Sequence, residues 1–251
     1  MLVAALDTAT LTLSCALVEL SPGSPLRVRC ERTERAPART PGGTPTGHGS
    51  RLPGALGDLL VAEGLELPAV EGYAVGLGPG SFTGLRIGLA TFKGLAYANR
   101  RPLTGASSLA AMALRAAPDA PPGALLVPLL DAKKGEVYAG FYRAEAGTVR
   151  AVEPEVALSP AALLDRLAPL GGGAFAFGEG YSAFETVLAG RLARLETALQ
   201  GPPAVAVAAL CGPRLLGADY DQQALFALEP HYVRKSEAEV KYPQGLPPVK
   251  P

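Results

Sequence analysis

The sequence has no tryptophan, only two histidines and three cysteines, and no excess of either charge. The cysteines, Cys15, Cys30 and Cys211, form no C-x-x-C pair, which excludes a zinc knuckle and a dithiol redox site. His48 and His231 are too far apart for a helical His-x-x-x-His metal pair. Acidic and basic residues number 23 each, which argues against a protein that binds nucleic acid on its own, because phosphate neutralisation needs a basic surplus.

Long apolar runs are missing as well. The longest, at 124–130 and 204–211, are much shorter than a membrane span, and the N-terminus has no basic leader. We therefore expect a cytoplasmic protein. Its 251 residues, 48% of them hydrophobic, are enough for one large or two modest domains with a proper core.

Glycine and proline are abundant, with 30 and 24 residues, and they separate segments of an α/β chain. The predicted strands are 2–6, 10–20, 26–32, 70–77, 127–131, 136–143 and 174–177. The predicted helices are 50–63, capped by Ser50, 82–99, 159–167 and 204–216. We expect partial disorder in the loop 33–49 and a loose tail at 236–251.

The second half of the chain repeats the pattern of the first. Val127–Asp131, like Val3–Asp7, is an apolar strand that ends in aspartate and is followed by a turn and another strand. This repetition predicts a duplicated unit and two lobes that face each other across a cleft. The first lobe would comprise residues 1–104 with a returning C-terminal helix at about 204–235, and the second, divergent lobe residues 105–203.

The two repeated aspartates are candidates for metal and phosphate chemistry. Asp7 and Asp131, with the hydroxyls of Thr8 and Thr10, could hold Mg²⁺ and phosphates, as in phosphotransferases of the actin-like class. The alternative is that each aspartate caps its own turn by accepting backbone N–H groups. Neither aspartate is followed two residues later by the glycine that such phosphate loops favour.

The glycine-rich segment 78–84 also has two interpretations. It could cradle a phosphate at the start of a helix, although it matches neither the dinucleotide fingerprint nor the P-loop. Alternatively it is a strand-to-helix turn that needs a positive φ, with Ser81 capping the helix. It is not a Gly-x-Ser-x-Gly nucleophile motif.

Small side chains gather on one arc of the helix that follows. The arc contains Gly84, Ile87, Gly88, Thr91, Gly94, Leu95 and Ala98. It either packs against the protein's own sheet and first helix or forms a subunit interface together with the helix that carries Leu52, Leu56 and Leu59.

The basic side chains elsewhere in the sequence have two possible roles. Lys133, Lys134 and the arginines 32, 35 and 39 either touch RNA within an assembly or form an ordinary solvated surface.

Several segments, in the same order, resemble the TsaB family of tRNA threonylcarbamoyladenosine biosynthesis proteins, also called YeaZ. They are 6–10, 75–88, 93–96, 107–109, 130–139 and 230–234, so that the resemblance runs from about residue 2 to residue 236. The long block around the glycine loop is its most specific part. The resemblance implies an α/β protein with an actin-like (ASKHA) fold, in which two RNase H-like lobes have mixed sheets and flanking helices.

The resemblance also implies a non-catalytic subunit. Such proteins pair with a TsaD-like subunit, which holds the metal and transfers threonylcarbamoyl to N6 of adenosine-37 in tRNAs that read codons beginning with adenine; a TsaE-like ATPase joins them. This chain would then need no cofactor of its own, ATP and metal belonging to its partners, and would meet tRNA only through the complex. The implied partner interface, also used for a homodimer when the partner is absent, consists of Leu52, Leu56, Leu59, Gly84, Ile87, Gly88, Thr91 and Leu95.

If the chain is non-catalytic, the cleft would be a vestigial nucleotide site marked by Asp7, Thr8, Thr10 and Asp131. Two rival hypotheses remain: a small-molecule phosphotransferase of the same fold that uses Asp7 and Asp131, and an inactive peptidase relative that only homodimerises.

Overall fold

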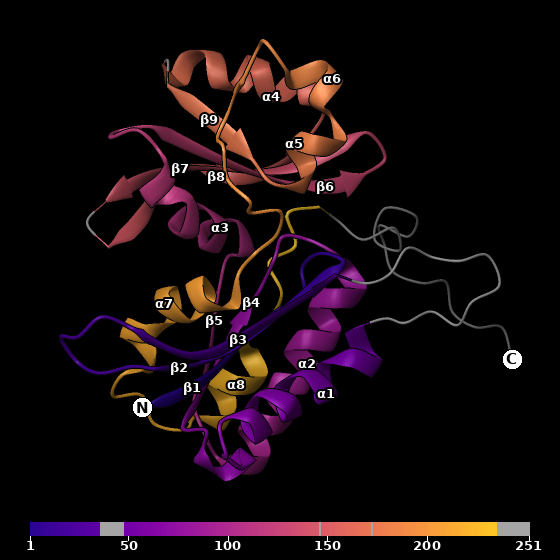
Figure 1. Cartoon of the computed structure of the whole chain (residues 1–251). Coiled ribbons are helices and arrows are strands. Elements are labelled where there is room, and N and C mark those ends of the chain that lie inside the picture. The colour runs from indigo at the N-terminus through magenta and orange to yellow at the C-terminus, as the bar shows by residue number, and fades with distance from the viewer. Residues whose placement is uncertain (36–47, 146, 172, 235–251) are drawn as a thin grey trace, which may run out of the picture.

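Two five-stranded sheets, one in each lobe, form the framework of the computed structural model (Figure 1). The structure describes residues 1–35, 48–145, 147–171 and 173–234. The first sheet has the strand order β3-β2-β1-β4-β5. Its strands are β1 Leu2–Asp7, β2 Thr12–Glu19, β3 Arg27–Arg35, β4 Gly72–Gly76 and β5 Leu103–Ala106.

The second sheet repeats this topology. Its order is β10-β9-β6-β7-β8, with β6 Leu125–Lys133, β7 Glu136–Glu145, β8 Thr148–Leu158, β9 Ala174–Phe177 and β10 Ala193–Arg194. In both sheets the first three strands are antiparallel, the fourth is parallel to the first, and the fifth is parallel to the fourth. The duplication and the mixed α/β sheets predicted from the sequence are confirmed.

Helices cover both faces of the first sheet. On one face lie α1 His48–Ala62, α2 Phe82–Asn99 and α8 Gln222–Ala227, and on the other lies α7 Ala204–Leu215 (Figure 1). Successive residues of β1 serve the two faces in turn: Ala4 and Leu6 pack towards α1 and α2, whereas Val3 and Ala5 pack towards α7. Both faces of the central strand are therefore buried.

The second sheet is covered in the same way. Helix α3, Ser108–Ala116, lies on the face that looks towards the first lobe, and its apolar side chains pack against β6 and β7. The opposite face is covered by α4 Pro160–Leu167, α5 Glu179–Ala183 and α6 Glu185–Leu188. Short 3₁₀ turns occur at 67–69, 117–119 and 168–170.

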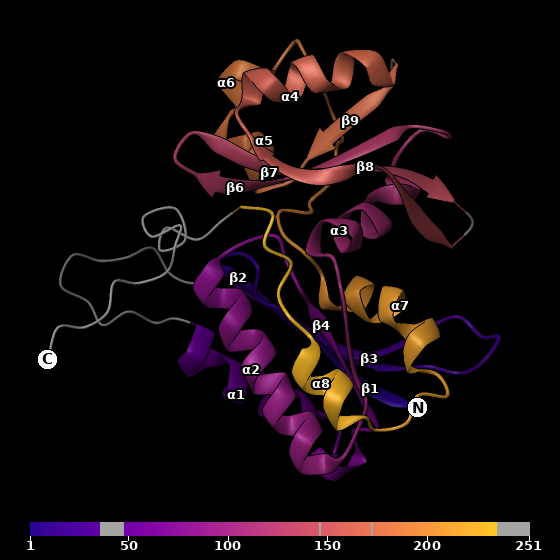
Figure 2. The same ribbon diagram turned by 180° about the vertical axis from the view of Figure 1, so that it is seen from behind.

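The C-terminal part of the chain returns to the first lobe. Helix α7 packs against β1, β4 and β5, and α8 packs against α2. Figure 2 shows the segment after α8 running beside α2 up to the space between the lobes. The predicted domain boundaries at residues 104 and 203 stay predictions.

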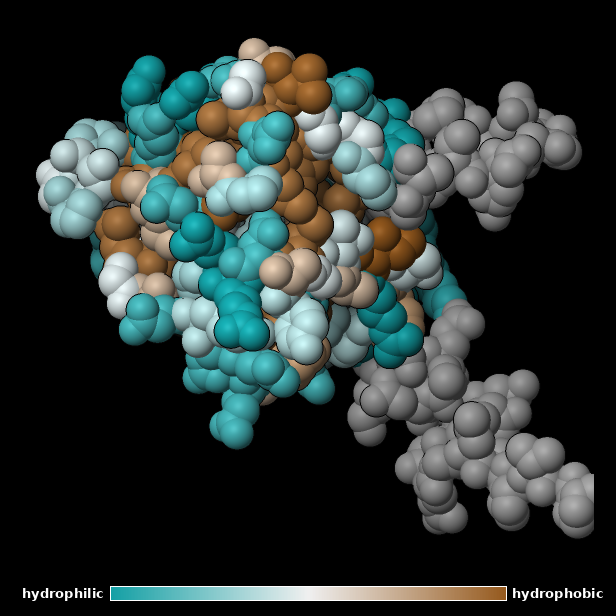
Figure 3. Space-filling model, turned by 90° about the horizontal axis from the view of Figure 1, so that it is seen from below, coloured by the Kyte–Doolittle hydropathy of each residue, from teal (hydrophilic) through white to brown (hydrophobic). Residues whose placement is uncertain are grey.

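Apolar residues also reach the surface. Figure 3 views the molecule from below the first lobe and shows a band of apolar residues surrounded by polar ones. Among the described residues, no helix is both long and apolar enough to cross a membrane.

Several predicted elements need correction. Strand β3 continues to Arg35 and α1 already begins at His48, so the predicted loop 33–49 is too long at both ends. Ser50 accordingly lies inside α1 and is not its cap. The remaining loop residues 36–47 and the tail 236–251 lie outside the described residues.

Other elements were missed. The sequence analysis assigned no strand to β5, β8 or β10 and no helix to α3, α5 or α6. The returning helix predicted at about 204–235 is not continuous, because α7 ends at Leu215 and α8 begins at Gln222. Strand β8 is an edge strand that carries Arg150, Glu153, Pro154 and Glu155, so it lacks the apolar alternation of a half-buried strand.

We predict that Ser14→Ala destabilises the fold because Ser14 fixes the returning helix. The buried Ser14 hydroxyl oxygen accepts a hydrogen bond from the Ala204 N–H at the start of α7, at 2.9 Å. Its loss leaves a buried donor unpaired, which costs about 1–3 kcal/mol. The matched control is Ser159→Ala, which removes the exposed cap of α4 and should cost about 1 kcal/mol. Urea unfolding measures both values, and a smaller loss for Ser14→Ala than for the control would contradict this role.

Candidate functional site

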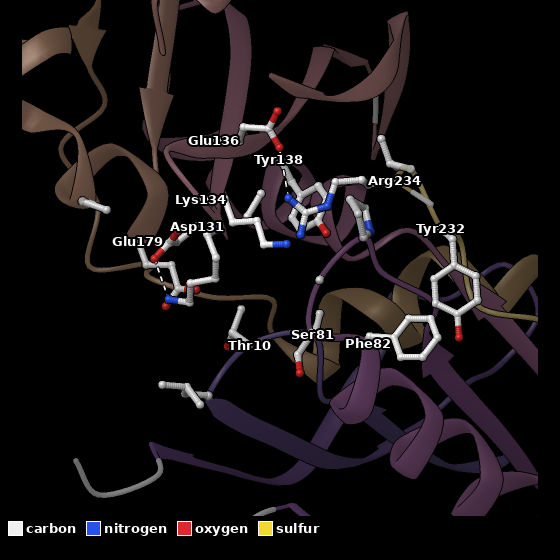
Figure 4. Close-up of a pocket in the computed structure, with 18 of the residues that line it drawn as sticks. Thr10, Ser81, Phe82, Asp131, Lys134, Glu136, Tyr138, Glu179, Tyr232 and Arg234 are labelled. Carbon is white, nitrogen blue, oxygen red and sulfur yellow. Dashed lines mark hydrogen bonds and ion pairs between the residues drawn. The ribbon is translucent and has the colours of Figure 1, made fainter. Parts of the chain in front are cut away.

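A cavity of about 1320 Å³ lies between the two lobes. The first lobe contributes the turn 9–11, the start of α2 and Arg35, and the second contributes the β6–β7 hairpin and α5. Residues 231–234 of the C-terminal segment form one wall. Figure 4 shows Lys134 and Arg234 reaching into this space from above, opposite Ser81 and Phe82.

Asp7 does not face this cavity. Its side chain is fully buried, and its two carboxylate oxygens accept hydrogen bonds from the Ala9 N–H at 2.8 Å and the Ser108 hydroxyl at 2.6 Å. Gly76 lies against it so closely that a Cβ there would collide with the carboxylate. Burial raises the pKa of Asp7 from its ordinary value near 3.8 to about 7, although the two hydrogen bonds favour the charged form. The predicted position at the mouth of the cleft is therefore wrong for Asp7.

Of the other three predicted cleft residues, two line the cavity and one does not. Thr8 is fully buried and donates a hydrogen bond to the Gly84 carbonyl at 2.9 Å, whereas Thr10 and Asp131 line the cavity. Asp131 accepts hydrogen bonds from the Lys133 N–H at 2.8 Å and from its Nζ at 2.6 Å. Both aspartates thus accept a backbone N–H from two residues further on, which confirms the turn-capping interpretation. Nucleotide binding in the cleft stays a prediction.

The glycine loop is a tightly packed strand-to-helix turn. Gly78 has a φ of +98°, the conformation that favours glycine, and the Gly78–Pro79 peptide bond is cis. The Ser81 N–H donates to the Ala9 carbonyl at 2.6 Å, and the Ser81 hydroxyl oxygen caps α2 by accepting the Gly84 N–H at 3.2 Å. The space beside Gly80 is filled by Ala9 of the neighbouring turn. The capping prediction for Ser81 is confirmed.

Part of the small-residue arc packs inside the lobe. Gly84 and Gly88 are buried, and a Cβ on Gly88 would collide with the Thr8 side chain. A larger residue at 88 would thus disturb the fold itself. The predicted interface residues Leu52, Leu56 and Leu59 are core residues with at most 6% exposure. As surface contacts, these five predictions are corrected: the three leucine side chains fill the lobe's own interior, and the two glycines are buried on the inner face of α2.

Half-buried and exposed residues remain on the same two helices. Ile87, Thr91 and Leu95 are half-buried. The outward-facing small or apolar residues, which we call the α1–α2 face, are Gly54, Gly57 and Val61 of α1 and Ala90, Gly94 and Ala98 of α2. A Cβ on Gly54, Gly57 or Gly94 would meet nothing within 4 Å.

The C-terminal segment ties the two lobes together. The His231 N–H donates to the Leu77 carbonyl of the first lobe at 2.7 Å, and its Nε2 lies 3.2 Å from Glu155 Oε2 of the second. The same Glu155 accepts hydrogen bonds from the hydroxyls of Ser107 and Tyr142. Its carboxylate raises the pKa of His231, and burial raises the pKa of Tyr142. Sequence reasoning missed Glu155 and Ser108, because only the fold brings them to the junction.

The cavity lining is rich in charge. Five of its residues are basic, Arg35, Arg86, Lys133, Lys134 and Arg234, and three are acidic, Asp131, Glu136 and Glu179. Burial raises the pKa of Glu179. Among the described residues, no group of three or more histidine, cysteine, aspartate or glutamate side chains could hold a metal ion.

Comparison with known proteins agrees with this architecture. A family model described as "TsaD: tRNA N6-adenosine threonylcarbamoyltransferase" matches residues 40–242. The chain is 30% identical over 171 residues to the Bacillus subtilis "tRNA threonylcarbamoyladenosine biosynthesis protein TsaB", covering 67% of this chain and 71% of that protein. The chain belongs to the TsaB family.

Further TsaB relatives support this assignment. The Escherichia coli TsaB is 35% identical over 141 residues, 56% of this chain, and the match spans only 61% of that relative's length. The solved structure "YeaZ from Pseudomonas aeruginosa" is 30% identical, covers 92% of this chain and 99% of its own, and superposes with a TM-score of 0.72. The family resemblance and the predicted actin-like fold of two RNase H-like lobes are thus confirmed.

We predict that the stability of this TsaB protein falls with rising pH because of Asp7. The folded protein retains a proton on Asp7 that the unfolded chain releases above about pH 4, so the stabilisation is complete below that pH and is lost as the pH rises through about 7. The loss approaches about 1.4 kcal/mol per pH unit in this window.

The Asp7→Asn variant, which cannot ionise, should lose this slope. Urea unfolding at several pH values between 4 and 8 would measure the difference between the wild type and the variant. Asp131→Asn is the matched control, because Asp131 caps the equivalent turn but lines the cavity. Identical pH slopes for the wild type and Asp7→Asn would show that Asp7 does not retain its proton.

Proposed function

We propose that this TsaB protein is a non-catalytic scaffold or activator subunit. It pairs with a TsaD-like subunit, joined by a TsaE-like ATPase, for formation of the threonylcarbamoyl group on N6 of adenosine-37 in tRNAs that read codons beginning with adenine. ATP and metal belong to the partner subunits, and the complex acts in the cytoplasm. The observation that carries this proposal is the similarity to the B. subtilis and E. coli proteins named for threonylcarbamoyladenosine biosynthesis.

The inward orientation of the Asp7 carboxyl group supports a non-catalytic role. The actin-like phosphotransferase hypothesis needs the Asp7 carboxylate to face metal and phosphate in the cleft. Here both of its oxygens are engaged by Ala9 and Ser108 in the interior. The match to a family model described as a transferase fits a pair of related subunits, of which the other performs the transfer.

The α1–α2 face supports pairing through helices. Its small side chains allow the backbone of a partner helix to approach closely, which favours helix packing. A TsaD-like subunit would occupy this face in the complex, and a second copy of this chain would occupy it when the partner is absent. The half-buried Ile87, Thr91 and Leu95 would contribute their outer edges to the same contact.

A reconstitution tests whether this chain activates the TsaD-like subunit without being an enzyme itself. The TsaD-like subunit, tRNA and threonylcarbamoyl-adenylate are combined with and without this chain, and modified adenosine is measured by mass spectrometry. We expect product only when both proteins are present, and no ATP turnover by the isolated chain. ATP turnover by the isolated chain that is lost in Asp131→Asn would instead support the phosphotransferase hypothesis.

We predict that Gly94→Arg abolishes pairing with the TsaD-like subunit while leaving the fold intact. Position 94 is exposed and has open space around it, so the new side chain projects outwards into the partner's place. The matched control is Ala161→Arg, an exposed position on α4 of the other lobe. Analytical ultracentrifugation of the mixed subunits should show a loss of affinity of at least about tenfold for Gly94→Arg only. Equal pairing by the two variants would contradict this interface.

A further inference from the structure

All four exposed aromatic side chains of the described residues lie along one ridge. They form two stacked pairs, Phe82 with Tyr232 at 4.9 Å between ring centroids and Tyr97 with Phe226 at 5.7 Å. In each pair one ring comes from α2; its partner is Phe226 of α8 in one pair and Tyr232 of the segment after α8 in the other. Figure 2 shows α8 and this segment beside α2. Exposed stacked rings do not gain the burial of a core, so their alignment on one ridge points to an external partner.

Each aromatic pair is accompanied by a cation. The Arg86 guanidinium lies 3.8 Å from the Phe82 ring centroid and donates to the Tyr232 hydroxyl at 2.9 Å. The Lys93 ammonium donates to the Phe226 carbonyl at 2.8 Å. Both hydrogen bonds go to neutral oxygens, and α2 contains no acidic residue, so the positive charge on this helix is not balanced within it.

The ridge becomes more basic towards the cavity. Near α8 the chain carries Asp219, Asp221 and Glu229, which offset Lys93. At the other end, Arg86 lines the cavity, whose lining has five basic and three acidic residues although the whole chain has a net charge of zero. Within this lining Lys133 pairs with Asp131 at 2.6 Å and Arg234 pairs with Glu136 at 3.0 Å. The local excess of positive charge therefore comes from Arg35, Arg86 and Lys134, set against Glu179.

The hairpin opposite Arg86 places two lysines at this rim in an unfavourable conformation. Lys133 and Lys134 have φ values of 62° and 55°, and they are two of the three described non-glycine residues with positive φ. Such conformations cost of order 1–3 kcal/mol and concentrate at functional sites. Figure 4 shows Lys134 reaching into the cavity beside Arg234.

We propose that this basic rim contacts RNA, namely the phosphates and an unpaired base of the tRNA held by the complex. We define the rim as Phe82, Arg86 and Tyr232 of one side and Lys133, Lys134 and Arg234 of the other. The inference rests on the proposed function, which brings tRNA to the complex.

The chemistry of the rim favours RNA over an acidic protein surface. Arginine and lysine side chains bind phosphate, and exposed aromatic rings stack on unpaired bases, which is how proteins recognise looped RNA. The cavity also exceeds the roughly 300–1,000 Å³ of an ordinary small-molecule site. A net charge of zero fits a contact that works only when partners supply the remaining affinity.

The test measures RNA affinity of the full chain in complex with its TsaD-like subunit. The probe is a fluorescent anticodon stem-loop RNA, and anisotropy is recorded over a range of salt concentrations. We expect Arg86→Gln and Lys134→Gln each to weaken binding about tenfold and to reduce the slope of log affinity against log salt by about 0.7. Arg191→Gln, an exposed site on the second lobe outside the cavity, is the matched control and should change neither value.

The alternatives give different results. Affinities within twofold of the control, with an unchanged salt slope, would overturn the proposal. Unchanged RNA binding with weakened pairing in ultracentrifugation would assign the rim to a protein partner. Displacement of the RNA by polyglutamate of equal charge as effectively as by unlabelled RNA would assign it to acidic peptides. If RNA binding depends on the rim but the chain does not stimulate adenosine modification, the proposed function fails while the RNA site stands.

Discussion

The buried carboxyl group of Asp7 holds together the chain segments that meet between the two lobes. Through Ser108 it joins the end of β1 to the first turn of α3, and the Ser108 hydroxyl oxygen also accepts the Gly78 N–H at 3.1 Å. Thr8 and Ala9 extend the same connection to the start of α2. The orientation of α2, and with it both the α1–α2 face and the basic rim, depends on this buried group.

This arrangement supports the scaffold role that we propose for this actin-like fold. The turn after β1, which could hold metal and phosphate, is used here to fix α2 against the sheet. The equivalent turn in the second lobe remains at the cavity, where Asp131 orients the Lys133–Lys134 turn. The duplicated aspartates have thus diverged: one stabilises the interior, and the other positions basic side chains at the surface. The C-terminal segment fixes the cavity wall by bonding to Leu77 and Glu155 of opposite lobes.

Local patterns in the sequence predicted much of the fold. The apolar strand that ends at Asp7, the Ser81 cap and the strand 174–177 all depend on neighbouring residues, and the structure has them. The second apolar strand is also present, but it continues past Asp131 to Lys133. The site was harder to predict because its geometry depends on distant contacts. Spacing alone placed Asp7 in the cleft, but the absence of a side chain at Gly76 leaves room for it to turn inwards. Similarly, helical periodicity grouped Gly88 with Gly94, although Thr8 covers only the first of them.

The most direct test of the central claim is mass spectrometry of nucleosides from total tRNA after depletion of this protein. Threonylcarbamoyladenosine is compared with a modification made by an unrelated pathway, which serves as the internal control. We expect selective loss of threonylcarbamoyladenosine, restored by the wild-type chain and not by Gly94→Arg. Unchanged threonylcarbamoyladenosine in depleted cells that have no second copy of the protein would contradict the scaffold account.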